Sequence, residues 1–186
     1  PESRAELETL LGMVTYLSKF SQNLADLTNP LRALIKSDSH FRWDRQHDKA
    51  FEKVKQALTE SPVLAYFDNN KPVTLQVDSS KHGLGACILQ DGKPVIYASK
   101  SLTPTEVGYA QIEKEMLAIL FGCKRFHHFV YGRHVLVQSD HKPIESIMRK
   151  SLSAAPARLQ RMLLQLQAYN IEVKHFSGKS IPVADT

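Results

Sequence analysis

Acidic side chains at the ends of predicted strands and on a predicted helix offer the clearest chemistry in this chain. They are Asp78, Glu115, Asp140 and Asp185. Carboxylates gathered at one place repel one another unless a cation lies between them, and Mg²⁺ favours such hard oxygen ligands. Two such ions about 4 Å apart activate a water and stabilise the leaving oxygen in phosphodiester hydrolysis. The sequence therefore predicts a metal-dependent hydrolytic site, provided that the fold brings these acids together.

Each of these acids, taken alone, also has an ordinary structural explanation. A strand-end aspartate such as Asp78 most often caps a turn, and Asp140 has the position of a helix N-cap shortly before Pro143. Glu115 fits a solvent-facing position on a helix, and Asp185 lies next to the end of the chain. The choice between these explanations depends on the elements that position the four residues.

The strand that ends at Asp78 alternates in polarity, because Val73, Leu75 and Val77 all point to one face. A glycine-containing turn leads into a second strand at 84–90. The dipeptide Asp91-Gly92 then suits a two-residue hairpin turn into a third strand at 94–99, since such turns require positive φ angles. These residues predict a three-stranded antiparallel meander.

A helical crossover follows the meander. Thr103-Pro104-Thr105-Glu106 has the pattern of a capping box with proline at the first helical position, and the helix is predicted to run to about Val130. It carries Glu115 and leads to a fourth strand at 133–139, which ends at Asp140. Such a crossover favours parallel pairing of the first and fourth strands. The two strand-end aspartates should then be neighbours, with Glu115 beside them.

The remaining elements complete a mixed α/β sheet preceded by a helical segment. A short helix after Pro143 and a longer one over about 155–169 precede a fifth strand at 171–176. Residues 1–66 show three amphipathic helical patterns, the third with Asp44 as its N-cap, and they cluster no chemistry. We therefore predict a helical domain at 1–66 and a five-stranded domain at 67–186.

Composition is consistent with a polyanionic partner but does not establish one. Residues 1–66 carry nine basic and nine acidic side chains, whereas 67–186 carry fifteen and ten, so the whole net charge of +5 lies in the second region. Such an excess is also typical of a solubilising surface. The only cysteines, Cys87 and Cys123, have apolar neighbours and indicate core positions in a reducing compartment. No stretch approaches the roughly 20 apolar residues of a membrane span, and the start of the sequence shows no signal-peptide pattern. We expect an intracellular protein that is not secreted.

Six motifs occur in a characteristic order along the chain. They are Thr74-Leu75-Gln76-Val77-Asp78-Ser79-Ser80, Gly83-Leu84-Gly85-Ala86, Ile96-Tyr97-Ala98-Ser99-Lys100-Ser101-Leu102, Glu113-Lys114-Glu115-Met116-Leu117-Ala118-Ile119, Ser139-Asp140-His141-Lys142-Pro143 and Pro182-Val183-Ala184-Asp185. In this order they resemble the ribonuclease H domain of gypsy-type LTR retrotransposon reverse transcriptase polyproteins. Residues 1–60 resemble the thumb- or connection-like segment that joins the polymerase to that domain.

The resemblance implies a ribonuclease H-like fold and hydrolysis of the RNA strand of RNA–DNA hybrids by two-metal-ion catalysis. It assigns Asp78, Glu115, Asp140 and Asp185 as ligands of two Mg²⁺ ions, for which Mn²⁺ is a possible substitute. Glu115 is chosen over Glu113 because the family's glutamate precedes the pattern matched by residues 116–119. The implied partners are the RNA–DNA hybrid and the polymerase domain of the same polyprotein.

The resemblance also leaves several points open. The Tyr-x-Asp-Asp motif of the polymerase is absent, so no polymerase activity is expected, and the helix that follows Asp185 in the family is missing from this sequence. A catalytically inactive hybrid-binding or connection module is the alternative function. His175 fits either proton transfer or a structural hydrogen bond. Candidate phosphate contacts, which solvated helix faces explain equally well, are Lys124, Arg125, His127, His128, Arg158 and Arg161.

Overall fold

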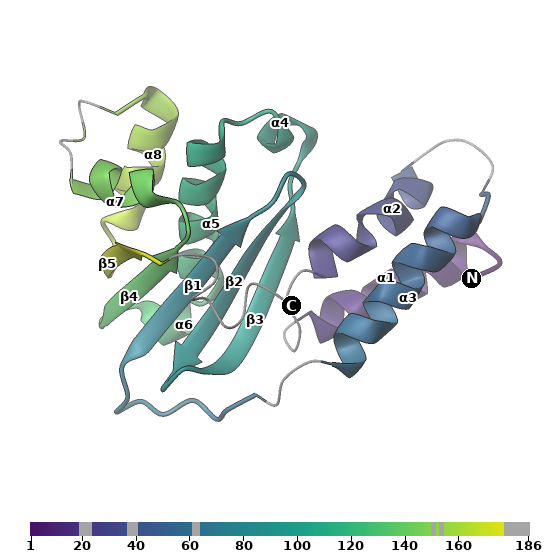
Figure 1. The fold of residues 1–186 in the computed structure, drawn as a ribbon, viewed down its shortest axis with the longest axis horizontal. Helices are drawn as coiled ribbons and strands as arrows, with labels where there is room; N and C mark the ends of the chain where they lie inside the picture. Colours follow the sequence, from purple (N-terminus) through teal and green to yellow (C-terminus); the bar gives the residue numbers. More distant parts are fainter. Residues whose placement is uncertain (19–23, 37–40, 61–63, 150–151, 153–154, 177–186) are drawn as a thin grey trace.

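The computed structural model of this chain describes residues 1–18, 24–36, 41–60, 64–149, 152 and 155–176. Within them a five-stranded sheet lies between two groups of helices (Figure 1). The first three helices lie beside the β3 edge of the sheet, and the later helices cover one of its faces and the β5 edge. No helix in the described part of the chain is long and apolar enough to cross a membrane.

The sheet is mixed, with strand order β3-β2-β1-β4-β5. Its strands are β1 (Val73–Ser79), β2 (Gly83–Gln90), β3 (Lys93–Ser101), β4 (His134–Ser139) and β5 (Asn170–His175). The first three pair antiparallel, whereas β4 pairs parallel with both β1 and β5. At the β2–β3 turn Asp91 and Gly92 have φ values of 52° and 71°, so the predicted hairpin is confirmed. The predicted neighbourhood of the first and fourth strands is confirmed as well.

The crossover between β3 and β4 contains three helices instead of the single predicted one. They are α4 (Pro104–Val107), α5 (Gln111–Arg125) and α6 (His127–Val130). The predicted capping box is confirmed at Thr103, but the helix that it starts ends at Gly108. Ala110 is extended, with ψ 152°, and the carboxylate of Glu113 accepts a hydrogen bond from its backbone N–H at 3.0 Å. This second helix start competes with continuation of the first, so the prediction of one long helix is wrong.

Helix α5 packs across β1 and β2 and buries Met116, Ile119 and Cys123 against the sheet. The close approach depends on Gly122, because a Cβ atom there would lie 3.1 Å from Leu75 Cδ1. Cys123 and Cys87 are free, buried thiols, as the sequence predicts. Helices α7 (Lys142–Arg149) and α8 (Ala157–Leu166) complete the main hydrophobic core.

The helical segment consists of α1 (Arg4–Leu17), α2 (Leu24–Lys36), which includes Pro30, and α3 (Arg45–Thr59). Asp44 caps α3 as predicted, because its carboxylate accepts a hydrogen bond from Gln46 N at 2.9 Å. The buried side chains of this segment form small clusters separate from the core of the sheet. Helix α2 nevertheless contacts β3 and β2, so the segment lies against the sheet (Figure 1).

Candidate metal centre

Three of the four predicted acids meet at one end of the sheet, where the neighbouring strands β1 and β4 end. Asp78, Glu115 and Asp140 each offer a carboxylate oxygen, and these three oxygens all lie within 4.8 Å of one another. Asp78 is half-buried, Glu115 is buried and Asp140 is exposed, so the cluster opens toward solvent on one side. Asp185, the fourth predicted ligand, lies outside the described residues.

Strand register explains why the two aspartates meet. The parallel ladder between β1 and β4 pairs Leu75 with Val137 and Gln76 with Gln138. Asp78 and Asp140 each come two residues later, so both leave the ladder at the same level. Glu115 reaches them because α5 begins at this end of the sheet and lies across β1.

One oxygen of Glu115 is held by two neighbouring side chains. Glu115 Oε1 accepts hydrogen bonds of 2.7 Å from Ser79 Oγ and of 2.7 Å from Gln111 Nε2. Gln111 Nε2 also lies 3.0 Å from Ser79 Oγ, which closes a three-membered network. Glu115 Oε2 is buried and has no hydrogen-bond partner. A buried carboxylate oxygen without a donor is energetically costly, and a cation is the partner that would satisfy it.

Electrostatics at the cluster favours protonation in the absence of a cation. The pKa of Glu115 is raised to about 7, chiefly by burial and also by the charges of Asp140 and Asp78, while the hydrogen bonds from Ser79 and Gln111 oppose this rise. Burial and the charge of Asp140 likewise raise the pKa of Asp78. Three converging carboxylates, one unpartnered oxygen and two raised pKa values fit a site for a hard divalent cation.

A further acid reaches this region from the helical segment. Asp26 of α2 has a buried Oδ1 atom without a hydrogen-bond partner, and its charge contributes to the raised pKa of Asp78. The two aspartates line one small hollow together with Gly83. A Cβ atom at Gly83 would lie only 2.6 Å from Asp26 Oδ1, so this approach requires glycine.

Sequence reasoning missed Asp26, Ser79 and Gln111. Gln111 precedes Glu115 by four residues, and this spacing places two helical side chains on the same face. Ser79 directly follows Asp78, but nothing in the strand pattern indicates that its hydroxyl reaches α5. For Asp26 the only signal was an acid next to the buried Leu24 and Ala25, and no local pattern connects it to β1.

Two of the basic residues predicted as phosphate contacts, Arg158 and Lys124, contact other side chains of the protein. Arg158 Nη1 donates to both carboxylate oxygens of Glu113 at 2.8 Å, and its guanidinium carbon lies 4.0 Å from the centre of the Tyr109 ring. Arg158 therefore ties α8 to the start of α5. Lys124 hydrogen-bonds Gln165, and it follows Glu115 by nine residues, which is on the order of 14 Å along the helix axis. A role in phosphate binding for these residues stays a prediction.

His175 lies at the same end of the sheet as the cluster. It pairs with Ser139, the residue before Asp140, and its backbone N–H donates to Glu145 Oε2 at 3.4 Å. The side chain is exposed. This position is compatible with either of the two roles predicted for the residue.

Comparison with known proteins identifies the family. The model of the RNase H-like domain found in reverse transcriptase matches residues 43–137, just over half of the chain and including Asp78 and Glu115. The Retrovirus-related Pol polyprotein from transposon 297 of Drosophila melanogaster is 33% identical over 186 residues, which cover 100% of this chain and 17% of the relative. The Transposon Tf2-3 polyprotein of Schizosaccharomyces pombe is 33% identical over 192 residues, covering 100% of this chain and 14% of the relative. The chain thus spans less than a fifth of each relative.

Solved structures agree at the level of the fold. The foamy viral protease-reverse transcriptase in complex with an RNA/DNA hybrid superposes with a TM-score of 0.78 at 22% identity, over 96% of this chain and 25% of that chain. The same viral protein in complex with dsDNA gives a TM-score of 0.77 at 22% identity, over 96% of this chain and 39% of that one. Both comparisons include the helical segment together with the sheet. The chain therefore belongs to the family of RNase H-like domains found in reverse transcriptase, as its sequence motifs predict.

Proposed function

We propose that this chain is the ribonuclease H module of a retrotransposon reverse transcriptase and cleaves the RNA strand of RNA–DNA hybrids. The observation that carries the proposal is the meeting of Asp78, Glu115 and Asp140 in a fold of this family. The viral relative of similar fold forms a complex with an RNA/DNA hybrid, which supports the same substrate here. Because the matched relatives are polyproteins, we assign the polymerase to another part of the same polyprotein.

In this proposal, the three carboxylates hold two divalent cations, Mg²⁺ or its substitute Mn²⁺, with Asp185 as the predicted fourth ligand. Such ions, when bound, lower the pKa of a coordinated water and stabilise negative charge on the leaving 3′ oxygen. Ser79 and Gln111 keep Glu115 Oε1 in place, so Oε2 is the oxygen available as a ligand. Because Glu115 has a raised pKa, cation binding near neutral pH should release a proton.

The reaction joins a water oxygen to phosphorus and breaks the bond between phosphorus and the 3′ oxygen. Its products carry a 5′-phosphate and a 3′-hydroxyl, because one proton of the water is passed through solvent to the leaving 3′ oxygen. The RNA strand is distinguished by its 2′-hydroxyls, which are displayed in the wide minor groove of the hybrid. Within the proposed division of the chain, residues 67–186 carry this activity and residues 1–66 connect it to the polymerase.

The test is cleavage of a labelled RNA–DNA hybrid by this chain with and without Mg²⁺. Asp78→Asn should reduce cleavage by about 1,000-fold or more while hybrid binding persists. The matched control is Asp91→Asn, which changes an aspartate of the β2–β3 turn that pairs with Lys71.

Three outcomes are informative. Cleavage by the wild type and the Asp91→Asn control, but not by Asp78→Asn, supports the proposal. Equal binding without cleavage by all three proteins would establish the alternative function, an inactive hybrid-binding module. Undiminished cleavage by Asp78→Asn would refute the assignment of the site.

A further inference from the structure

We propose that a cleft between the helical segment and the sheet binds a backbone phosphate of the nucleic-acid strand that enters the acidic site. The cleft, called here the Arg32 cleft, measures about 600 Å³ and is lined by residues of α1, α2 and β3. This inference rests on the proposed function, because it assumes a nucleic-acid substrate. It adds a binding role for the helical segment, to which the sequence assigns no chemistry.

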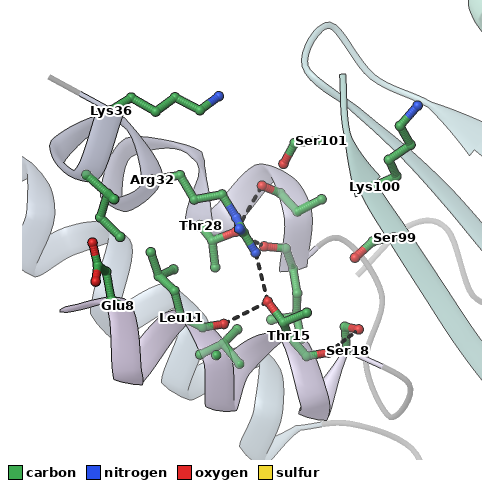
Figure 2. Close-up of a pocket in the computed structure, with 15 residues that line it drawn as sticks. Glu8, Leu11, Thr15, Ser18, Thr28, Arg32, Lys36, Ser99, Lys100 and Ser101 are labelled. Atoms are coloured by element: carbon green, nitrogen blue, oxygen red, sulfur yellow. Dashed lines mark hydrogen bonds between the residues drawn. The ribbon is translucent and has the colours of Figure 1, made fainter. Parts of the chain in front are cut away.

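Arg32 is held in this cleft by neutral partners (Figure 2). Its Nε donates to Thr28 Oγ1 at 3.3 Å, and its Nη2 donates to Thr15 Oγ1 at 2.9 Å. Thr28 is 1% exposed and in turn donates to Leu24 O at 2.7 Å. Within the described part of the chain two of the five guanidinium N–H groups are thereby engaged, which leaves the other three for a ligand. In the described part of the chain, no carboxylate lies within ion-pair distance of Arg32.

The other charged groups of the cleft leave a net positive charge. Lys36, at the end of α2, is exposed and makes no ion pair within the described ranges. Glu8 pairs with Arg4 at 3.4 Å, and Lys100 pairs with Glu106 at 2.8 Å. Among the described residues of the cleft, the charges without an ion-pair partner are therefore those of Arg32 and Lys36. A fixed guanidinium with a second cation nearby matches phosphate, which accepts several hydrogen bonds at once.

The opposite wall of the cleft also suits a phosphate oxygen. Ser99 and Ser101 of β3 face the two helices across the cleft in Figure 2. Hydroxyl groups of this kind are common donors to the nucleic-acid backbone, and they carry no preference for sequence. The lining therefore fits contacts that position a strand.

The place of the cleft indicates a nucleic-acid strand rather than an isolated anion. Ala25 and Ser99 line both the Arg32 cleft and the small hollow beside Asp78, so the two cavities adjoin. When one phosphate of a strand lies at the acidic cluster, the neighbouring phosphates of that strand lie close to the residues around the cluster. Arg32 and Lys36 follow Asp26 on α2 by six and ten residues, on the order of 9 and 15 Å along the helix axis. The carboxylates repel the phosphates of the strand, and these two cations would offset that repulsion at phosphates beyond the site.

The experiment measures the affinity of the full chain for a fluorescent RNA–DNA hybrid at several salt concentrations, with Ca²⁺ replacing Mg²⁺ to suppress cleavage. The variants are Arg32→Gln, Lys36→Gln and their combination. The matched control is Lys53→Gln, which removes an exposed lysine of α3 that does not line the cleft. The combined variant should raise Kd by about 10-fold and lower the slope of log Kd against log salt by about 1 to 2. The control should change neither quantity.

The remaining outcomes separate this inference from the ribonuclease assignment. If the double variant binds the hybrid with the affinity of the wild type and still cleaves it, the role of the cleft would be refuted and the ribonuclease assignment would be unaffected. If the wild type binds the hybrid but does not cleave it, and the double variant binds more weakly, the result would support the phosphate-binding cleft and not the ribonuclease assignment. A wild-type protein without affinity for hybrid would overturn the inference. Lys36→Gln changes only an exposed side chain, so its smaller loss of affinity supports the inference even if Arg32→Gln unfolds α2.

Discussion

Charged side chains are arranged differently in the helical segment and in the sheet. In the helical segment ion pairs form between near neighbours in sequence, such as Arg4 with Glu8 and Lys55 with Glu52. At the ends of the central strands β1 and β4, three acids from distant parts of the chain meet without a basic partner within ion-pair distance among the described residues. The ion pairs of the helical segment follow from residue spacing along one helix, whereas the cluster of acids follows from the topology of the sheet. An arrangement that destabilises the metal-free fold is expected where function requires it.

The largest expected effect tests whether the two regions have separate cores. Leu75 lies in the core of the sheet, and Leu7 lies in a cluster of the helical segment. Leu75→Ala should lower the free energy of unfolding by about 3 to 5 kcal/mol, because it leaves a cavity beside Gly122. Leu7→Ala should accelerate hydrogen exchange in α1, α2 and α3 while β1 stays protected. Equal loss of protection in β1 from both substitutions would contradict separate cores.

The second prediction concerns the stability of the metal-free protein between pH 5 and 7.5. Glu115 has its pKa raised to about 7 in the fold, above the 4.5 of the unfolded chain, so folding favours its protonated form. The contribution of Glu115 to the free energy of unfolding is fully present below pH 4.5 and is lost as the pH rises through 7. The free energy of unfolding should fall by about 2 to 3 kcal/mol over this range, and the raised pKa of Asp78 acts in the same direction.

Urea denaturation at several pH values measures this loss. Glu115→Gln is the matched control, because its amide oxygen can still accept from Ser79 and Gln111 without a charge. Most of the pH dependence should disappear in this variant. Added Mg²⁺ should restore stability to the wild type near pH 7.5, since a ligand of the folded state stabilises it. A stability that rises with pH in the metal-free wild type would refute the electrostatic account of the cluster.

The third prediction addresses the contact between the two regions. Gly83→Ala places a Cβ atom 2.6 Å from Asp26 Oδ1, and the resulting shift should cost about 1 to 2 kcal/mol. The matched control is Gly12→Ala in α1, where no atom lies within 4 Å and where alanine should stabilise the helix by up to about 1 kcal/mol. If α2 packs against the β1–β2 turn in solution, Asp26→Ala should relieve the cost of Gly83→Ala. Additive effects in this double-mutant cycle would show that the contact is absent.

The smallest expected effect comes from Asp26, an acid of α2 that lies beside Gly83 and Asp78 of the sheet. Asp26→Asn removes a negative charge near Asp78 and keeps the shape of the side chain, so it should stabilise the metal-free protein by about 0.5 to 1 kcal/mol. Glu52→Gln, on the exposed side of α3, should stay within about 0.5 kcal/mol of the wild type. Thermal unfolding with and without Mg²⁺ measures both. Destabilisation by Asp26→Asn would show that this carboxylate has a stabilising partner.

Strong local patterns made most of the sheet predictable. The alternation of apolar residues predicted β1, and the Asp91-Gly92 turn predicted the β2–β3 hairpin. The helical crossover predicted that β4 would be the neighbour of β1. The continuous helix was wrongly predicted because the spacing of apolar residues does not reveal the extended backbone at Ala110. Arg158 had the sequence pattern of a surface cation, but it binds Glu113 across helices that are far apart in sequence.

The sequence by itself determined the chemistry available to this protein, because it supplies the carboxylates and ends two neighbouring strands with Asp78 and Asp140. Motif order also determined the family. Only the tertiary structure decided that Ser79 and Gln111 fix one oxygen of Glu115, and that α2 brings Asp26 and Arg32 close to the site. The physical reason is that helical and strand periodicities act over a few residues. The contacts at this site join residues tens of positions apart, and only packing of the helices on the sheet brings them together.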